Sequence, residues 1–290
     1  MFSPLMLGQV FVNGVSLSAI YILVALGFTL LFGIMRVVNF AHGSFAMLGG
    51  YALYYVYGAW HVPYLLAAPL AALGVAVASL VFERLVFRLF YQKMFQSMIA
   101  LLGLDMAISF TALLIWNPYE RSVPTPLDGV LEVGGLIVPE DKLVIAAVAA
   151  TALAGFWIFT RFTRHGLALR AASQDIEIAE AQGVDTVRLY RLAFLIAIFM
   201  AALAGGFYAQ TYSLSPTMGE RPLLMAFVVV ILGGMGSIPG VALGGLLLGF
   251  SESILSTFYG AATATFASFG VVFLLLVFRP WGLLGTPEHE

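Results

Sequence analysis

The length of its uninterrupted apolar runs is the feature that most constrains how this chain folds. One run, "LVIAAVAATALAGFWIFT" at residues 143–160, carries no charged side chain. The hydrocarbon core of a bilayer is about 30 Å thick and takes roughly 20 helical residues per crossing. Inside that core the backbone N–H and C=O groups must be paired within the protein, so a crossing segment is a helix or part of a closed barrel. Barrel strands would alternate over about ten residues, so the continuous runs predict helices.

Composition supports the same conclusion. The sequence is 61% hydrophobic and 10% charged, whereas a soluble domain is about half apolar and about a quarter charged. These charges are too few to cover a water-facing surface. We therefore predict an all-α polytopic membrane protein in which residues 1–290 form a single transmembrane domain.

Nine apolar segments are candidates for membrane-crossing helices, and we expect about eight to nine crossings, some of them interrupted. The first residues, "MFSPLMLGQVFVNG", lack the basic stretch of a signal peptide, so the first apolar run is expected to be retained as a span. The expected segments are 7–33, 44–59, 62–90, 95–116, 143–160, 187–212, 221–234, 240–259 and 263–279.

Basic residues predict the orientation of these segments. Lys and Arg near span ends mark cytoplasmic loops, and they gather in 83–93 and 161–191. Both segments are expected in the cytoplasm, which places the 117–142 loop outside and, through Arg279, the C-terminus inside. Counting backwards puts the N-terminus outside, unless residues 34–43 form a re-entrant turn.

Pairs of glycines recur in the apolar segments. Small residues let helix backbones approach closely in lipid. Packing within the chain is the simpler interpretation, and a subunit interface is the alternative. The pairs are Gly49 and Gly50, Gly205 and Gly206, Gly240 and Gly244, and Gly245 and Gly249.

The stretch "LLFGIMRVVNFAHGSFAMLGG" (30–50) is a first interrupted apolar segment. It places Arg36, Asn39 and His42 within seven residues, with a glycine on either side. Irregular backbone at membrane depth is tolerated only where protein or a water-lined cavity surrounds it. The simpler interpretation is an ordinary loop, in which Arg36 marks the cytoplasmic side and His42 is a hydrogen-bonded loop histidine.

The stretch "VVVILGGMGSIPGVALGGLLLG" (228–249) is interrupted in the same manner. Gly233 and Gly234 precede Pro239 there, and glycine and proline at this density break a helix. A pair of such segments in two halves of a chain points to the substrate path of a transporter. Because half-helix N-termini favour a carboxylate and C-termini an ammonium, a zwitterionic solute fits this arrangement.

Ionisable residues deep within the predicted spans are few. Asp105 occurs in "ALLGLDMAISF" and Glu252 in "LGFSESILS". A charge at the centre of a bilayer costs at least about 2.5–3.5 kcal/mol, so such residues face the protein interior and often have a functional role. The simpler interpretation of each is a buried cap or a helix–helix hydrogen bond.

Residues 164–190 form a long polar insert between two spans. From Ala168 to Gln182 the composition favours one short helix, with Gly183 as a C-terminal stop and Asp185 as the cap of the next helix. A simple connection needs only about 2–8 residues. A helix that docks into a partner's groove explains the extra length, and a solvated surface helix is the alternative.

Motifs of catalysis are missing from the sequence. It contains no G-x-x-x-x-G-K-[ST], no H-E-x-x-H and no G-x-S-x-G. Without cysteine it has no thiolate metal site or cysteine nucleophile, and its histidines are scattered. We expect no catalytic residues, no metal site and no cofactor in this chain. If ATP hydrolysis supplies energy, it takes place on another polypeptide.

Three stretches together resemble the branched-chain amino acid permease family of ABC importers, the LivH/LivM type. The opening signature is similar to residues 13–51, with N-F-A-H-G at 39–43. The ATPase-contacting motif resembles residues 164–185, and the third signature resembles residues 228–253 and ends at Glu252. The resemblance extends from about residue 8 to 285.

The resemblance implies a permease subunit that moves branched-chain or related apolar amino acids by alternating access in a bacterial inner membrane. The implied partners are a second homologous permease, two ATP-binding subunits that hold ATP and Mg²⁺, and a periplasmic substrate-binding protein. The residues expected along the substrate path are Asn39, His42, Gly233, Gly234 and Glu252.

The polar insert is the ATPase-coupling segment under this resemblance, within 161–191. It would transmit the movement of the ATPase pair to the permease. The residues expected to make or support that contact are Arg170, Asp175, Ile176, Ala179 and Gly183.

Two departures and two alternatives stay open. Asp105 lies where the family has a small or apolar residue, and residues 83–93 lack the family's usual Y-R-P-L-R motif. A transporter of the same type could carry urea, short amides, or aromatic or dicarboxylic acids. Alternatively, the chain could be a stand-alone channel or ion-coupled carrier with Asp105 and Glu252 in its path.

Overall fold

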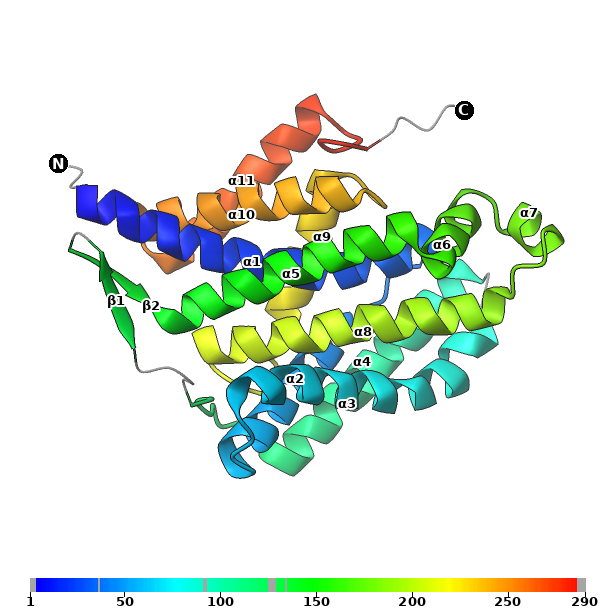
Figure 1. Cartoon of the computed structure of the whole chain (residues 1–290), viewed down its shortest axis with the longest axis horizontal. Coiled ribbons are helices and arrows are strands. Elements are labelled where there is room, and N and C mark those ends of the chain that lie inside the picture. The colour runs from blue at the N-terminus through cyan, green and yellow to red at the C-terminus, as the bar shows by residue number, and fades with distance from the viewer. Residues whose placement is uncertain (1–3, 36, 91–92, 125–128, 134, 286–290) are drawn as a thin grey trace.

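The computed structural model describes the chain except for residues 1–3, 36, 91–92, 125–128, 134 and 286–290. Arg36, the cation expected at the first interruption, therefore lies outside the described residues. The long helices run roughly along the longest axis of the molecule and pack around α1 (Figure 1). The helices are α1 (Pro4–Met35), α2 (His42–Leu53), α3 (Tyr64–Leu85), α4 (Met94–Trp116), α5 (Glu140–Phe162), α6 (Arg164–Gln174), α7 (Ile176–Ala181), α8 (Thr186–Thr211), α9 (Glu220–Gly233), α10 (Ile238–Tyr259) and α11 (Ala261–Phe278).

Every predicted apolar segment contains a helix, which confirms the all-α membrane fold. Among the described residues, six helices are long and apolar enough to cross a bilayer: α1, α3, α4, α5, α8 and α10. By contrast, α2 and α9 have only 12 and 14 residues, fewer than the roughly 20 that one crossing needs. A π-helical turn (Tyr54–Ala59) continues α2. The two short helices adjoin the two predicted interruptions.

The two basic segments lie at one end of the bundle. Glu83 lies near the end of α3, and its Oε2 is 3.6 Å from Nε of Arg191, in the second turn of α8. The end of α3 and the start of α8 are therefore adjacent. The N-terminus lies at the opposite end, together with a hairpin that the sequence did not predict (Figure 1). In that hairpin β1 (Val130–Val133) pairs antiparallel with β2 (Leu136–Pro139).

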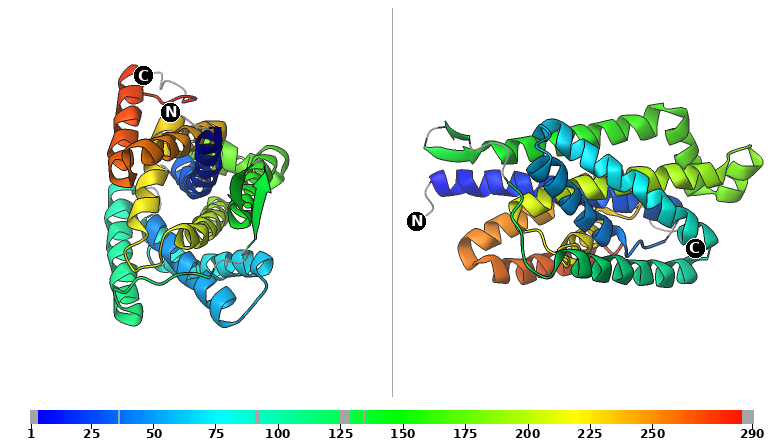
Figure 2. Two further views of the ribbon diagram at one scale, coloured as in Figure 1. Left: turned by 90° about the vertical axis from the view of Figure 1, so that its left-hand side faces the viewer. Right: turned by 90° about the horizontal axis from the view of Figure 1, so that it is seen from below.

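Helix α1 occupies the centre of the molecule. In its most apolar stretch of 18 residues, 83% of the residues are buried, whereas the corresponding share is 22% in α4 and in α5. Small residues bring the neighbouring backbones close to it: a Cβ added at Gly27 would lie 2.4 Å from the Ala197 carbonyl of α8, and one at Gly249 would lie 2.5 Å from Ser18 N. The exposed apolar sides of α4 and α11 share one side of the molecule (Figure 2).

Glycines also permit the crossing of α2 and α8. A Cβ added at Gly205 would lie 1.8 Å from the Ala46 carbonyl oxygen, and one at Gly49 would lie 2.1 Å from the Ala202 oxygen. Because these distances are far below van der Waals contact, the two backbones touch where no side chain fits. Packing within the chain, rather than a subunit interface, therefore explains both glycines.

The single helix predicted for 168–182 is wrong. The insert forms α6 and α7, divided at Asp175, whose φ of −151° and ψ of 115° are extended. The Asp175 carboxylate accepts a hydrogen bond from Ile178 N at 3.0 Å, so local capping overrides the helix-favouring composition. Gly183, with φ of 86°, and Asp185, which caps α8 through Arg188 N at 3.0 Å, take the predicted roles.

We predict that Gly205→Ala lowers the melting temperature of the purified protein by several degrees. The added methyl group would overlap the Ala46 carbonyl, and overpacking of this kind costs about 1–3 kcal/mol. Gly103→Ala is the matched control, because nothing lies within 4 Å of a Cβ there and alanine favours helix by about 1 kcal/mol. Thermal unfolding in detergent measures both; equal melting temperatures would contradict the backbone contact.

Candidate functional site

Asn39 lies in the break between α1 and α2 and is buried. Its backbone carbonyl accepts a hydrogen bond from His42 N at 3.1 Å. Asn39 is only 1% exposed, and neither its Oδ1 nor its Nδ2 has a hydrogen-bond partner among the residues that the structure describes. An unpaired buried amide costs about 1–3 kcal/mol, so this carboxamide is available to a ligand or to water.

His42 is a core histidine rather than a loop histidine. It starts α2, is fully buried, and its Nε2 lies 3.0 Å from the Val24 carbonyl of α1. Since a carbonyl only accepts, the neutral ring carries its proton on Nε2 and leaves Nδ1 as an acceptor. Within the described part of the chain that Nδ1 has no hydrogen-bond partner, and the ring meets Phe28 edge-on at a centroid distance of 5.7 Å.

The two predicted interruptions meet in space. Gly236, in the break between α9 and α10, donates its N–H to Thr29 Oγ1 at 3.2 Å, and a Cβ added at Gly33 would lie 3.5 Å from Gly236 Cα. Gly234 and Gly236 have φ of 101° and 82°, the left-handed region that glycine adopts without strain. The turn therefore requires glycine at both positions.

Gly233 and Gly234 pack against the C-terminal segment of the described chain. Leu284 N donates to the Gly233 carbonyl at 3.0 Å, and a Cβ added at Gly234 would lie 2.4 Å from Gly285 N. Gly233 touches Gly240 near the start of α10. Glu252 lies twelve positions further along the same helix, which corresponds to a rise of about 18 Å. The structure thus separates these two glycines from Glu252.

The N-termini of α2 and α9 converge. A Cβ added at Gly43 would lie 2.3 Å from the Gly219 carbonyl oxygen, and one at Gly219 would lie 2.3 Å from the Gly43 oxygen. Neither helix has a side-chain cap. Helix N-termini carry partial positive charge, so their convergence creates a region inside the bundle that favours negative charge.

Asp105 supplies one negative charge to this region. Ser44, in the first turn of α2, donates its hydroxyl to Asp105 Oδ1 and lies 3.2 Å from Ser109 Oγ. The carboxylate thereby joins α4 to the N-terminus of α2. Of the two interpretations of Asp105 from the sequence, the helix–helix hydrogen bond describes what the structure shows.

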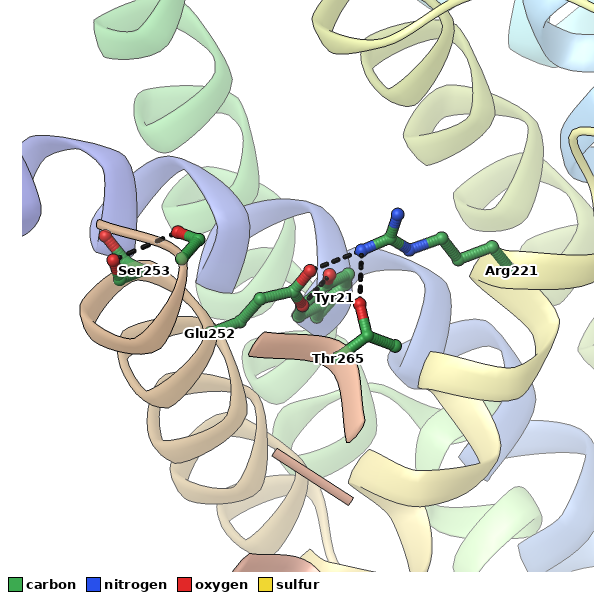
Figure 3. A network of polar contacts seen from close by, with 6 residues as sticks. Tyr21, Arg221, Glu252, Ser253 and Thr265 are labelled. Carbon is green, nitrogen blue, oxygen red and sulfur yellow. Dashed lines mark hydrogen bonds and ion pairs between the residues drawn. The ribbon is translucent and has the colours of Figure 1, made fainter. Parts of the chain in front are cut away.

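Glu252 lies in a polar cluster that was not predicted from the sequence (Figure 3). Its Oε2 accepts from the Tyr21 hydroxyl of α1 at 2.5 Å, and its Oε1 accepts from Arg221 Nη2 in the first turn of α9. Arg221 also contacts Thr265 Oγ1 of α11 at 3.3 Å, and its guanidinium carbon lies 5.3 Å from the centre of the Tyr212 ring. Arg221 was missed because it is the first residue of the expected apolar segment 221–234, where only the glycines at its end were considered as functional residues.

The coupling segment projects from the end opposite the N-terminus (Figure 1). Arg170, Asp175 and Gly183 are exposed, whereas Ala179 is buried and Ile176 packs against the core. Ile178 is the outward apolar side chain of α7, with 61% exposure. Ile176, the isoleucine expected to contact the ATPase, thus lies against the core, and Ile178 is the more exposed of the two.

In the part of the chain that the structure describes, no three His, Asp or Glu side chains lie close enough together to hold a metal ion. The polar groups instead form three separate features. These are the unpaired Asn39 and His42 beside the helix N-termini, the Arg221–Glu252 cluster, and the exposed surface of α6 and α7.

The chain is similar to known proteins along most of its length. Residues 10–278 match the family described as branched-chain amino acid transport system / permease component. The chain is 31% identical to the high-affinity branched-chain amino acid transport system permease protein BraD of Pseudomonas aeruginosa, over 97% of both proteins. It is 32% identical to LivH of Escherichia coli K12, a permease protein of the same description, over 96% of this chain and 95% of LivH.

A more distant relative is LivM of Escherichia coli K12, also named as a high-affinity branched-chain amino acid transport system permease protein. The identity is 26%, over 97% of this chain and 71% of LivM. No solved structure shows a significant match to this chain.

Proposed function

The chain belongs to the branched-chain amino acid transport system permease family and is a multi-pass permease component of an ABC importer, and from that premise we propose that it moves branched-chain or related apolar amino acids across a bacterial inner membrane. The observation that carries the proposal is the family match over residues 10–278. BraD and LivH are named as branched-chain amino acid permease proteins. In this chain, the buried polar groups at the helix breaks support a path for a solute.

The substrate path in this proposal passes the convergence of α2 and α9. Asn39 offers an unpaired carboxamide and His42 an unpaired ring nitrogen, while the two helix N-termini favour a carboxylate. Gly233 and Gly234 act as a hinge, because their backbone conformation and contacts depend on the absence of a side chain. Glu252 belongs to a second polar position along the path.

The proposed partners follow from what this chain lacks. The sequence has no phosphate-binding loop, so ATP and Mg²⁺ would be held by two ATP-binding subunits, and this chain has no cofactor of its own and no enzymatic activity. Its similarity to both LivH and LivM supports assembly with a second, related permease subunit. A periplasmic substrate-binding protein would deliver the solute at the end that carries the N-terminus.

Contact with the ATP-binding subunits is assigned to α6 and α7. Ile178 and Leu167 expose apolar side chains on these helices, and Arg170 and Asp175 lie on the same exposed segment. Asp175, Gly183 and Asp185 fix the ends of α7 and the start of α8. A movement of α7 therefore reaches α8 through a short, capped connection.

We expect ATP-dependent uptake of leucine, isoleucine or valine by proteoliposomes that contain the assembled transporter. The reconstitution combines this chain with a second permease subunit, two ATP-binding subunits and a substrate-binding protein. Liposomes without the ATP-binding subunits are the control and should show no uptake. Uptake by this chain alone under an ion gradient would contradict the importer and support a carrier instead.

Asn39→Leu should reduce uptake without reducing stability. Leucine has the same number and branching of side-chain heavy atoms and removes an unpaired buried amide, so the melting temperature should stay unchanged or rise. Ser16→Ala is the matched control, because the Ser16 hydroxyl is also buried without a partner but lies far from the break in sequence. Undiminished uptake by Asn39→Leu would remove Asn39 from the path.

Ile178→Glu should uncouple ATP hydrolysis from transport, lowering uptake at least about tenfold. A charge at this position would disrupt an apolar contact with the ATP-binding subunit while leaving the exposed residue free of clashes in this chain. Ile178→Leu preserves the apolar surface and serves as the control. ATPase activity and uptake are measured on the same preparation, and wild-type coupling in Ile178→Glu would exclude α7 as the contact.

A further inference from the structure

We propose that Arg221 and Glu252 together form a charge-selective recognition site for zwitterionic α-amino acids, in which Arg221 binds the carboxylate and Glu252 the ammonium of the solute. This inference rests on the proposed function and assigns a chemical role to a position on the same path. It adds Arg221, which the sequence analysis did not consider.

The position of the cluster suits a step within the path. Tyr21 lies near the middle of α1, a helix of 32 residues, and donates to Glu252 on α10. Arg221 lies in the first turn of α9 and Thr265 on α11. The cluster therefore joins four helices inside the bundle, where ionisable groups pair with one another and mark solute pathways.

Stability alone does not explain the pair. Taking two charges out of water costs as much as their attraction returns, and apolar replacements of buried pairs are often neutral or stabilising. Arg221 is also placed at a helix N-terminus, where a cation is electrostatically unfavourable. A charged pair in this position points to a role that an apolar pair could not take.

The two partners differ in accessibility. The Arg221 side chain is 36% exposed and the Glu252 side chain 4% exposed, so an arriving solute meets the guanidinium first. The Arg221 Nε–H is buried and has no hydrogen-bond partner in the described portion of the chain. Guanidinium groups bind carboxylates through two parallel N–H donors, and Nε is a donor that the present contacts leave unused.

Exchange with a zwitterion keeps the charges balanced. Arg221 and Glu252 sum to zero, and so do the carboxylate and ammonium of an α-amino acid at neutral pH. When the solute inserts, each of the four charges gains an opposite partner, while the Tyr21 and Thr265 hydroxyls remain as neutral hydrogen-bonding groups. A solute with only one charge would leave one buried charge without compensation, which the low-dielectric interior penalises.

The test measures binding to the full permease complex in the absence of the substrate-binding protein. The probes are leucine, leucinamide, which lacks the carboxylate, and 4-methylpentanoate, which lacks the ammonium. We expect leucine to raise the melting temperature of the wild-type complex with an apparent affinity at least about tenfold higher than that of either analogue.

Each single variant should change the preferred charge. Arg221→Gln leaves a net negative site and should bind leucinamide at least as well as leucine, whereas Glu252→Gln should favour 4-methylpentanoate. If a single variant does not fold, the double variant Arg221→Gln/Glu252→Gln restores neutrality and should show no preference among the three probes. A preference for leucine that survives in the variants, or equal or absent responses in the wild type, would overturn the inference.

The same preparations separate this inference from the proposed function. ATP-driven leucine uptake that is absent from the assembled wild-type transporter would overturn the proposed function. Uptake that is present, with unchanged probe preferences in the variants, would overturn the recognition site alone.

Discussion

The contact between the backbones of α2 and α8 is the interaction on which the other features of the site depend. Gly49 and Gly205 remove the side chains that would separate these helices, and in lipid such close van der Waals packing drives helix association. With α2 held there, His42 reaches the Val24 carbonyl of α1, and Gly43 meets Gly219 at the start of α9. Moving α2 outward would break all three contacts.

The electrostatics of the interior follow from the same arrangement. Two uncapped helix N-termini meet at Gly43 and Gly219, and carboxylates lie around them. Asp105 contacts the first turn of α2 through Ser44, and Glu252 contacts the first turn of α9 through Arg221. Negative charge near a helix N-terminus is stabilising, so these acidic residues offset the partial charges of the two half-helices.

Helix α8 links α6 and α7 to this interior. It begins at the Asp185 cap directly after α7, lies beside the buried Glu83 at Arg191, and reaches the α2 crossing at Gly205. A continuous helix of 26 residues is a rigid element with a defined axis. A displacement at the start of α8 therefore has a direct mechanical route to α2, through contacts that all lie within one chain.

The sequence by itself determined the membrane class, the positions of the apolar helices, the two interruptions and the caps at Gly183 and Asp185. Each of these depends on neighbours within a few residues or on the hydrophobic length of one segment. Only the tertiary structure decided which groups Asp105 and Glu252 contact, since Tyr21 and Glu252 are 231 positions apart. It also decided that Asp175 divides the coupling segment and that Ile178 faces outward, because capping geometry and burial, rather than composition, set the orientation of a short helix.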